Sequence, residues 1–84
     1  MKKTKKQMED ENRRVSANIV YYQGIRNTSD DRCALALGMS VRTFKRRIST
    51  PGDFTIAELA TLANLLNTTS QRLQFGQLEV EVVA

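Results

Sequence analysis

Hydrophobic residues recur at intervals of three and four along most of this chain, which is the pattern of amphipathic helices. The first stripe is formed by Val15, Ile19 and Tyr22. The helix that carries it is predicted to begin near residue 9 and to stop at Asn27, a residue type that tolerates the left-handed conformation. Ile25, near the end of this helix, is expected to fold back onto the core.

Two short helices joined by a tight turn are predicted between residues 29 and 50. Ser29 is a suitable N-cap for the first of them. Gly38 is expected to end it, because glycine adopts the left-handed conformation at low steric cost. Ser40 follows as an N-cap for a second helix over residues 41–49. Cys33 is expected to face inward from the first helix as a small buried hydrophobic residue.

The helix over residues 41–49 divides into an apolar face and a basic face. Val41, Phe44 and Ile48 fall within one narrow stripe, which is the face to bury. The opposite face carries Arg42, Thr43 and Arg46, with Lys45 and Arg47 on its flanks. A short helix with a cationic, hydrogen-bonding face fits the major groove of DNA. The alternative is a charged face that only keeps the helix soluble.

A further helix begins with the clearest local signal in the chain. Thr55 and Glu58 have the spacing of a capping box, and Phe54 and Leu59 have that of a hydrophobic staple. Its apolar positions are Ile56, Leu59, Leu62, Ala63 and Leu66. A fifth, short helix containing Leu73 and Phe75 is expected to start after Thr68 or Thr69 and to end at Gly76.

The tail, residues 77–84, changes to a period of two, with Leu78, Val80 and Val82 alternating with polar residues. This alternation indicates a strand. Because no other segment offers a strand to pair with, the tail is either disordered, packed on its own domain, or paired with a second copy across a two-fold axis.

The middle of the chain resembles the phage-repressor class of helix-turn-helix proteins, the Xre/Cro-like family. The resemblance is carried by Ala34, Gly38, Met39, Ser40 and Phe44, and it continues through the segment PGDFTIAELATLANLLNTT, so that it covers about Ile19 to Phe75. It implies an all-α, compact, five-helix, lambda-repressor-like domain. In such proteins the first residues of the second helix contact base edges.

The resemblance places base readout on Val41, Arg42 and Arg46, and it places Ser40 near the DNA backbone. With the charge pattern, it gives four base-contacting candidates: Val41, Arg42, Thr43 and Arg46. The phosphate-contacting candidates are Lys2, Lys3, Lys5, Lys6, Arg32, Ser40, Lys45 and Arg47.

Two positions depart from the family pattern. Asp30 stands where the family usually has a glutamine that grips a phosphate, so this chain needs another anchor, such as Arg32 or Arg26. Capping of the helix that starts at Ser29 explains this carboxylate more simply. Arg47 occupies a slot that is often apolar, which implies a slightly rotated recognition helix.

The distribution of charge adds to the case for a polyanionic partner. The net charge is +4, with four lysines in residues 2–6 and four basic residues in 42–47, which leaves −4 for the rest of the chain. Residues 1–8 are predicted to be a flexible basic arm and residues 9–76 the folded domain. Two cationic patches on an acidic body favour binding of nucleic acid at defined places.

Composition excludes several other classes. With no histidine, one cysteine and no glycine-rich phosphate loop, an enzyme is not expected, and no spacing suits a metal or cofactor. No small-molecule ligand is evident. No apolar run is long enough to cross a membrane, the N-terminus is not a secretory signal, and a single cysteine suits a reducing cytoplasm.

The sequence therefore predicts a cytoplasmic, sequence-specific regulator of transcription, such as a phage repressor, that binds double-stranded DNA as a homodimer. The alternative is a protein-interaction module, an antirepressor or adaptor, on the same scaffold. Asp30 and Asp31, close to the expected phosphate grip, keep this alternative open.

Overall fold

The computed structural model of the 84-residue chain describes residues 4–76, and these form helices without any strand. The elements are α1 (Lys5–Arg26), α2 (Asp30–Leu37), α3 (Val41–Ser49), the 3-10 turn η1 (Pro51–Asp53), α4 (Ile56–Leu65) and α5 (Ser70–Phe75). The prediction of an all-helical fold with five α-helices is confirmed. The predicted strand in the tail lies outside the described residues.

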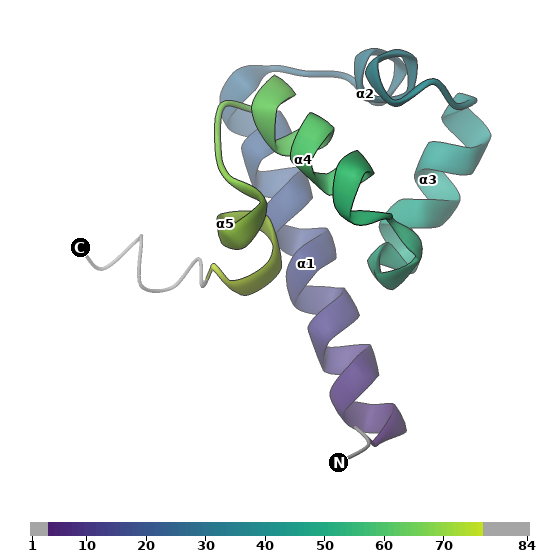
Figure 1. Cartoon of the computed structure of the whole chain (residues 1–84), viewed down its shortest axis with the longest axis vertical. Helices are drawn as coiled ribbons and strands as arrows, with labels where there is room; N and C mark the ends of the chain where they lie inside the picture. Colours follow the sequence, from purple (N-terminus) through teal and green to yellow (C-terminus); the bar gives the residue numbers. More distant parts are fainter. Residues whose placement is uncertain (1–3, 77–84) are drawn as a thin grey trace.

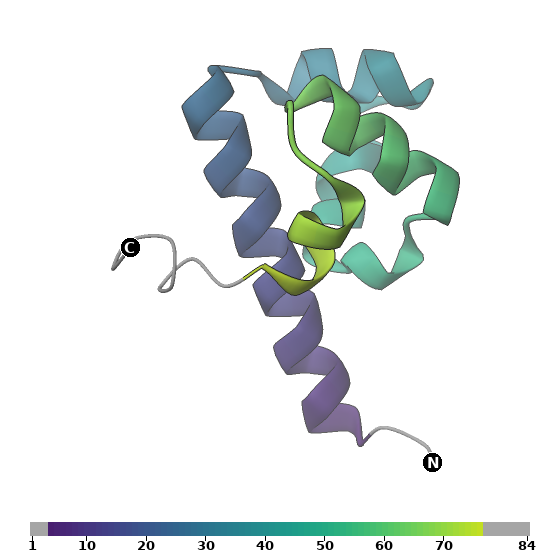
Figure 2. The same ribbon diagram turned by 60° about the vertical axis from the view of Figure 1, so that its left-hand side comes forward.

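The long helix α1 runs along the length of the molecule (Figures 1 and 2). It packs against α5, α3 and η1, while α4 packs against both α2 and α5. The side chains that these helices bury between them are Ile19, Tyr22, Cys33, Ala34, Phe44, Phe54, Leu59, Leu62, Ala63, Leu66 and Leu73. The pair α2 and α3 thus lies on one side of the core and α5 on the other.

The start of α1 differs from the prediction. The helix begins at Lys5, so the flexible arm predicted for residues 1–8 is wrong for residues 5–8. The physical reason is a capping box at the N-terminus. Thr4 Oγ1 accepts the Gln7 N–H at 3.1 Å, and Gln7 Oε1 accepts the Thr4 N–H at 2.8 Å. These two bonds satisfy backbone donors that would otherwise favour fraying.

The predicted ends of the central helices are confirmed. Asn27 and Gly38 adopt left-handed conformations, with φ of 51° and 69°. Ser29 and Ser40 each accept a backbone N–H bond from the third residue further along. The short polar segments therefore fix where α2 and α3 begin, as local capping chemistry requires.

Two predicted core positions are exposed instead. Ile25 is 54% exposed and Ile56 is 85% exposed. Each lies six residues from a fully buried residue of its own helix, Ile19 or Leu62. At 3.6 residues per turn, six positions place a side chain about 120° around the helix from that residue. Both isoleucines therefore lie on the edge of the apolar stripe and are left exposed among the described residues.

A buried amide holds α1 against the end of α5. The side-chain nitrogen of Asn18 donates to the carbonyls of Arg72, Leu73 and Gly76 at 3.3, 3.0 and 2.9 Å. A Cβ at Gly76 would come within 2.5 Å of the Arg72 carbonyl oxygen, so only glycine fits there. Asn18 is 1% exposed, and its amide adds a donor to the carbonyls at the end of α5, of which the Arg72 carbonyl also accepts the Gly76 N–H at 2.9 Å.

Candidate nucleic-acid interface

Helix α3 is oriented by its apolar stripe. Phe44 is fully buried, and Val41 and Ile48 are partly buried against the core, as predicted. Arg42 and Arg46 lie two residues before and after Phe44, so each is about 160° around the helix from it. The two arginines are therefore close together on the side that faces solvent, and both are exposed.

Three basic side chains make up the exposed side of α3, and we refer to Arg42, Lys45 and Arg46 as the α3 cationic face. All three are exposed. Within residues 4–76, no acid pairs with any of them and none uses its side chain in an internal hydrogen bond. The face therefore presents three positive charges that the domain itself does not neutralise.

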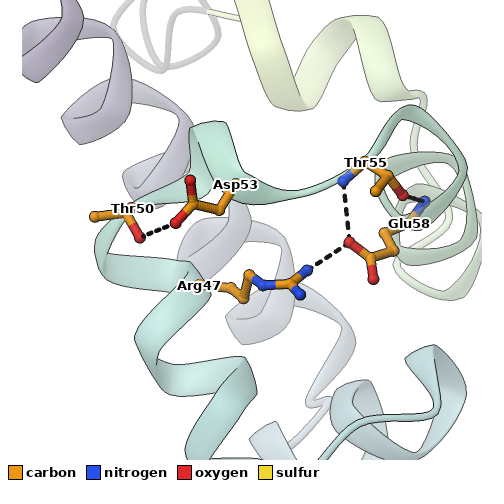
Figure 3. Close-up of polar contacts among 5 residues, drawn as sticks. All are labelled: Arg47, Thr50, Asp53, Thr55 and Glu58. Atoms are coloured by element: carbon orange, nitrogen blue, oxygen red, sulfur yellow. Dashed lines mark hydrogen bonds and ion pairs between the residues drawn. The ribbon is translucent and has the colours of Figure 1, made fainter.

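The fourth basic residue of α3 has a different environment (Figure 3). Arg47 Nη1 donates to Glu58 Oε1 at 2.6 Å, and its guanidinium carbon lies 5.9 Å from the centre of the Phe54 ring. The two charged side chains are 26% and 24% exposed. The predicted phosphate contact of Arg47 stays a prediction, whereas its partner in the free protein is Glu58 on α4.

The carboxylate of Glu58 serves two partners with one oxygen. Oε1 also accepts the backbone N–H of Thr55 at 3.0 Å, and Thr55 Oγ1 accepts the Glu58 N–H at 3.0 Å, which confirms the predicted capping box. The Thr55 N–H bond, followed by the Arg47 guanidinium, holds the pKa of Glu58 below its usual value. Beside it, Thr50 Oγ1 and Asp53 Oδ2 lie 3.1 Å apart across η1 (Figure 3).

The other candidates at the start of α3 are less exposed than its arginines. Val41 is partly buried against the core, and Thr43 is partly buried as well. Ser40 Oγ donates to Thr43 Oγ1 at 3.0 Å and accepts the Thr43 N–H at 3.1 Å. The hydroxyl of Thr43 keeps its own hydrogen to donate, so this pair can still offer one donor to a ligand.

The two acidic residues in the first turn of α2 stabilise the N-terminus of that helix. Gln23 Nε2 donates to Asp30 Oδ1 at 2.9 Å, and Asp30 and Asp31 lie in the first turn, where the helix dipole favours negative charge. The sequence alone did not predict this contact of Gln23 with the start of α2. Arg26 and Arg32, which precede and follow these acids in the sequence, are both exposed, and their role as a phosphate anchor stays a prediction.

Gln23 also lies beside the single cysteine. Its Nε2 is 3.5 Å from Cys33 Sγ, and the cysteine is fully buried, as predicted. Burial raises the pKa of the Cys33 thiol. This cysteine therefore packs as a small apolar side chain, and its burial and raised pKa both disfavour the thiolate.

The lysines of the N-terminal region do not join the α3 cationic face. Lys5 and Lys6 lie exposed in the first turn of α1, which projects past η1 and away from α2 (Figures 1 and 2). Lys2 and Lys3 lie outside the described residues. The structure thus brings Arg42, Lys45 and Arg46 together and leaves Lys5 and Lys6 as a separate basic end.

Neither a metal centre nor a membrane span is found in residues 4–76. No three His, Cys, Asp or Glu side chains there are grouped to hold a metal ion. Every helix in that range is too short or too polar to cross a bilayer.

The chain gives no match to any protein-family model, to any curated protein or to any solved structure. The resemblance to phage repressors therefore stays a prediction, and inferences about function rest on the geometry of α2, α3 and their neighbours.

Proposed function

We propose that this protein is a sequence-specific DNA-binding regulator of transcription, of the kind found in phages, prophages and bacteria, with α3 as its recognition helix. The single observation that carries this function is the α3 cationic face. Arg42, Lys45 and Arg46 extend from a helix whose opposite side is anchored by the fully buried Phe44. A nine-residue helix with an exposed basic face has the size and charge that enter a major groove.

The residues of α3 have distinct roles in this function. Arg42 and Arg46, close together at the pole opposite Phe44, read base edges, and guanine is the base that arginine contacts most often. Lys45, on the flank, contacts a phosphate. Arg26 or Arg32 near the start of α2 supplies a phosphate anchor in place of the family's glutamine. A two-fold dimer places two such helices about 34–36 Å apart on a pseudo-palindromic site.

Selection of binding sites from random oligonucleotides with the purified full chain tests this function. A selected site and a scrambled version of it then allow two variants of neighbouring residues to be compared. Arg46→Ala is expected to weaken the selected complex by about 1–3 kcal/mol and to relax the base preference. Lys45→Ala is expected to weaken both complexes alike and to lower the salt slope by about 0.9 per protomer.

Arg72→Ala provides the matched control, because Arg72 is an exposed cation on α5, on the other side of the core. It is expected to leave the affinity and the salt slope unchanged. Equal losses on selected and scrambled DNA for Arg46→Ala would contradict base readout by that residue.

The second candidate is a protein-interaction module that meets an acidic surface. The observation in its favour is the pair of carboxylates, Asp30 and Asp31, at the start of α2, because they repel DNA phosphates. Selection distinguishes the two functions. Failure to enrich any DNA, and failure to bind DNA at low salt, would favour the interaction module.

A further inference from the structure

The bond between Arg47 and Glu58 connects the end of α3 to the start of α4 at a point where both side chains are already held. Glu58 Oε1 is fixed by the Thr55 N–H, and the Arg47 guanidinium lies over the Phe54 ring. Phe54 is itself buried, and its ring centre lies 6.3 Å from that of Phe44. The ion pair therefore links the end of α3 to a carboxylate that the α4 cap already holds in place.

Helix α3 needs such a restraint, because its apolar anchor is narrow. Phe44 is the one residue of α3 that is fully buried, and Val41 and Ile48 are only partly covered. A nine-residue helix held mainly along one line can rotate about its own axis. Arg47 lies about 60° around the helix from Phe44, so its bond to α4 acts off that line and opposes rotation.

The direction of the arginines depends on this rotation. Arg42 and Arg46 extend from the helix on the side opposite Phe44, so any rotation of α3 turns both guanidinium groups through the same angle. Recognition of base edges requires side chains held to within about 10–20° of the productive geometry. A restraint on the rotation of α3 therefore decides which bases these arginines can reach.

We propose that Glu58 and Arg47 are positioning residues for recognition: the bond between them fixes the rotation of α3 and so determines sequence specificity, without either residue touching a base. This inference rests on the proposed function of α3 in reading DNA. It assigns Arg47 a role different from that of Lys45 or Arg46, although all three are basic residues of one helix. This role also explains why Arg47 is basic at a position that is often apolar in the family that the sequence resembles.

The experiment compares Glu58→Gln, Arg47→Gln and the double variant with the natural chain, on the selected site and on scrambled DNA at several salt concentrations. Glu58→Gln is informative because a glutamine amide oxygen still accepts the Thr55 N–H, so the capping box survives, while Arg47 loses its charged partner and keeps at most a weaker, neutral acceptor. Thr55→Ala is the matched control: it weakens the same cap and leaves the Arg47–Glu58 bond in place.

Each single variant is expected to lower the ratio of specific to scrambled affinity by roughly five- to 150-fold, the effect of one mismatched base pair. The double variant is expected to lose no more than either single variant, because all three break one bond. Arg47→Lys, which keeps a charge opposite Glu58, should retain more of the ratio than Arg47→Gln. The salt slope should stay unchanged throughout.

Two results on DNA would overturn the inference. If Arg47→Gln lowers the salt slope by about 0.9 per protomer and weakens both complexes equally, while Glu58→Gln strengthens them, Arg47 is a phosphate ligand. If Thr55→Ala lowers the ratio as much as Glu58→Gln, the loss reflects a weakened α4 cap and not the ion pair.

A measurement without DNA separates this inference from the proposed function. The backbone amide NMR shifts of residues 41–43, at the start of α3 and therefore away from Arg47, are expected to move in the same way in Glu58→Gln and Arg47→Gln, but not in Thr55→Ala. Unchanged shifts in both variants would overturn the positioning role. If the natural chain binds no DNA while these shifts move as expected, the function in DNA binding fails and the restraint on α3 stands.

Discussion

Two contacts between helices hold opposite sides of this molecule by different physics. On the α1–α5 side, the neutral amide of Asn18 lies buried and donates to three backbone carbonyls. On the α3–α4 side, Arg47 and Glu58 form an ion pair that is about a quarter exposed. The first contact is dry and uncharged, whereas the second is in reach of solvent and salt.

The two contacts are therefore expected to have different effects, the first on the stability of the fold and the second on the orientation of α3. Removal of a buried donor leaves carbonyls without partners, and each unsatisfied buried group costs about 1–3 kcal/mol. A partly exposed ion pair contributes about 0–1 kcal/mol, because water competes for both charges. The α1–α5 side is therefore expected to dominate folding, while the α3–α4 side directs the arginines of α3 at little gain in stability.

Removal of the buried amide should have the largest effect. Asn18→Ala is expected to lower the free energy of unfolding by about 2–4 kcal/mol, since the carbonyls of Arg72, Leu73 and Gly76 lose a shared donor. Urea unfolding at pH 7 measures it. Asn12→Ala is the matched control, because the Asn12 side chain accepts one exposed N–H, from Gly52, and should cost less than about 1 kcal/mol. Equal losses in Asn18→Ala and Asn12→Ala would contradict the large contribution to stability that is assigned to the buried amide.

Loss of the α4 cap should have an intermediate effect. Thr55→Ala removes the oxygen that accepts the Glu58 N–H, and it is expected to cost about 0.5–2 kcal/mol in urea unfolding. Because the Arg47–Glu58 bond does not need the threonine hydroxyl, specificity for DNA should stay unchanged. A loss above 3 kcal/mol would show that α4 depends on this cap more than its buried leucines suggest.

Loss of the ion pair should have the smallest effect on stability. Glu58→Gln is expected to cost less than about 1 kcal/mol at pH 7. The pKa of Glu58 is lowered by folding, so its carboxylate stabilises the folded state above its unfolded value, near 4.5, and this contribution is lost as pH falls through the folded pKa. The difference between natural chain and variant should therefore vanish in acid.

Urea unfolding at pH 7 and at decreasing pH below 4.5 measures this dependence. The difference should also shrink in 1 M salt, which screens the partly exposed pair. A difference that grows as pH falls would have the wrong sign for a carboxylate stabilised by Arg47.

The parts of the fold that the sequence predicted are those set by local chemistry. Ser40 begins α3 and Gly38 ends α2 because each satisfies backbone groups within a few residues of itself. The period of three and four likewise placed Phe44 inward. The start of α1 was missed, although Thr4 and Gln7 have the capping-box spacing, because no apolar stripe accompanies them.

The missed contacts are those between distant residues. Arg47 and Glu58 are 11 positions apart on two helices, and Asn18 reaches carbonyls 54 to 58 positions away. Helical periodicity tells which face a residue is on but not which side chain of another helix lies opposite. The exposure of Arg42 and Arg46 could be predicted, because helical periodicity places both residues on the face opposite Phe44.

The most direct test of the central claim, that Arg42 and Arg46 read base sequence, is to repeat the random-oligonucleotide selection with the double variant Arg42→Ala/Arg46→Ala and with Lys45→Ala. We predict that the natural chain and Lys45→Ala enrich the same motif, whereas the double variant enriches none. Enrichment of that same motif by the double variant, with equal strength, would contradict the claim.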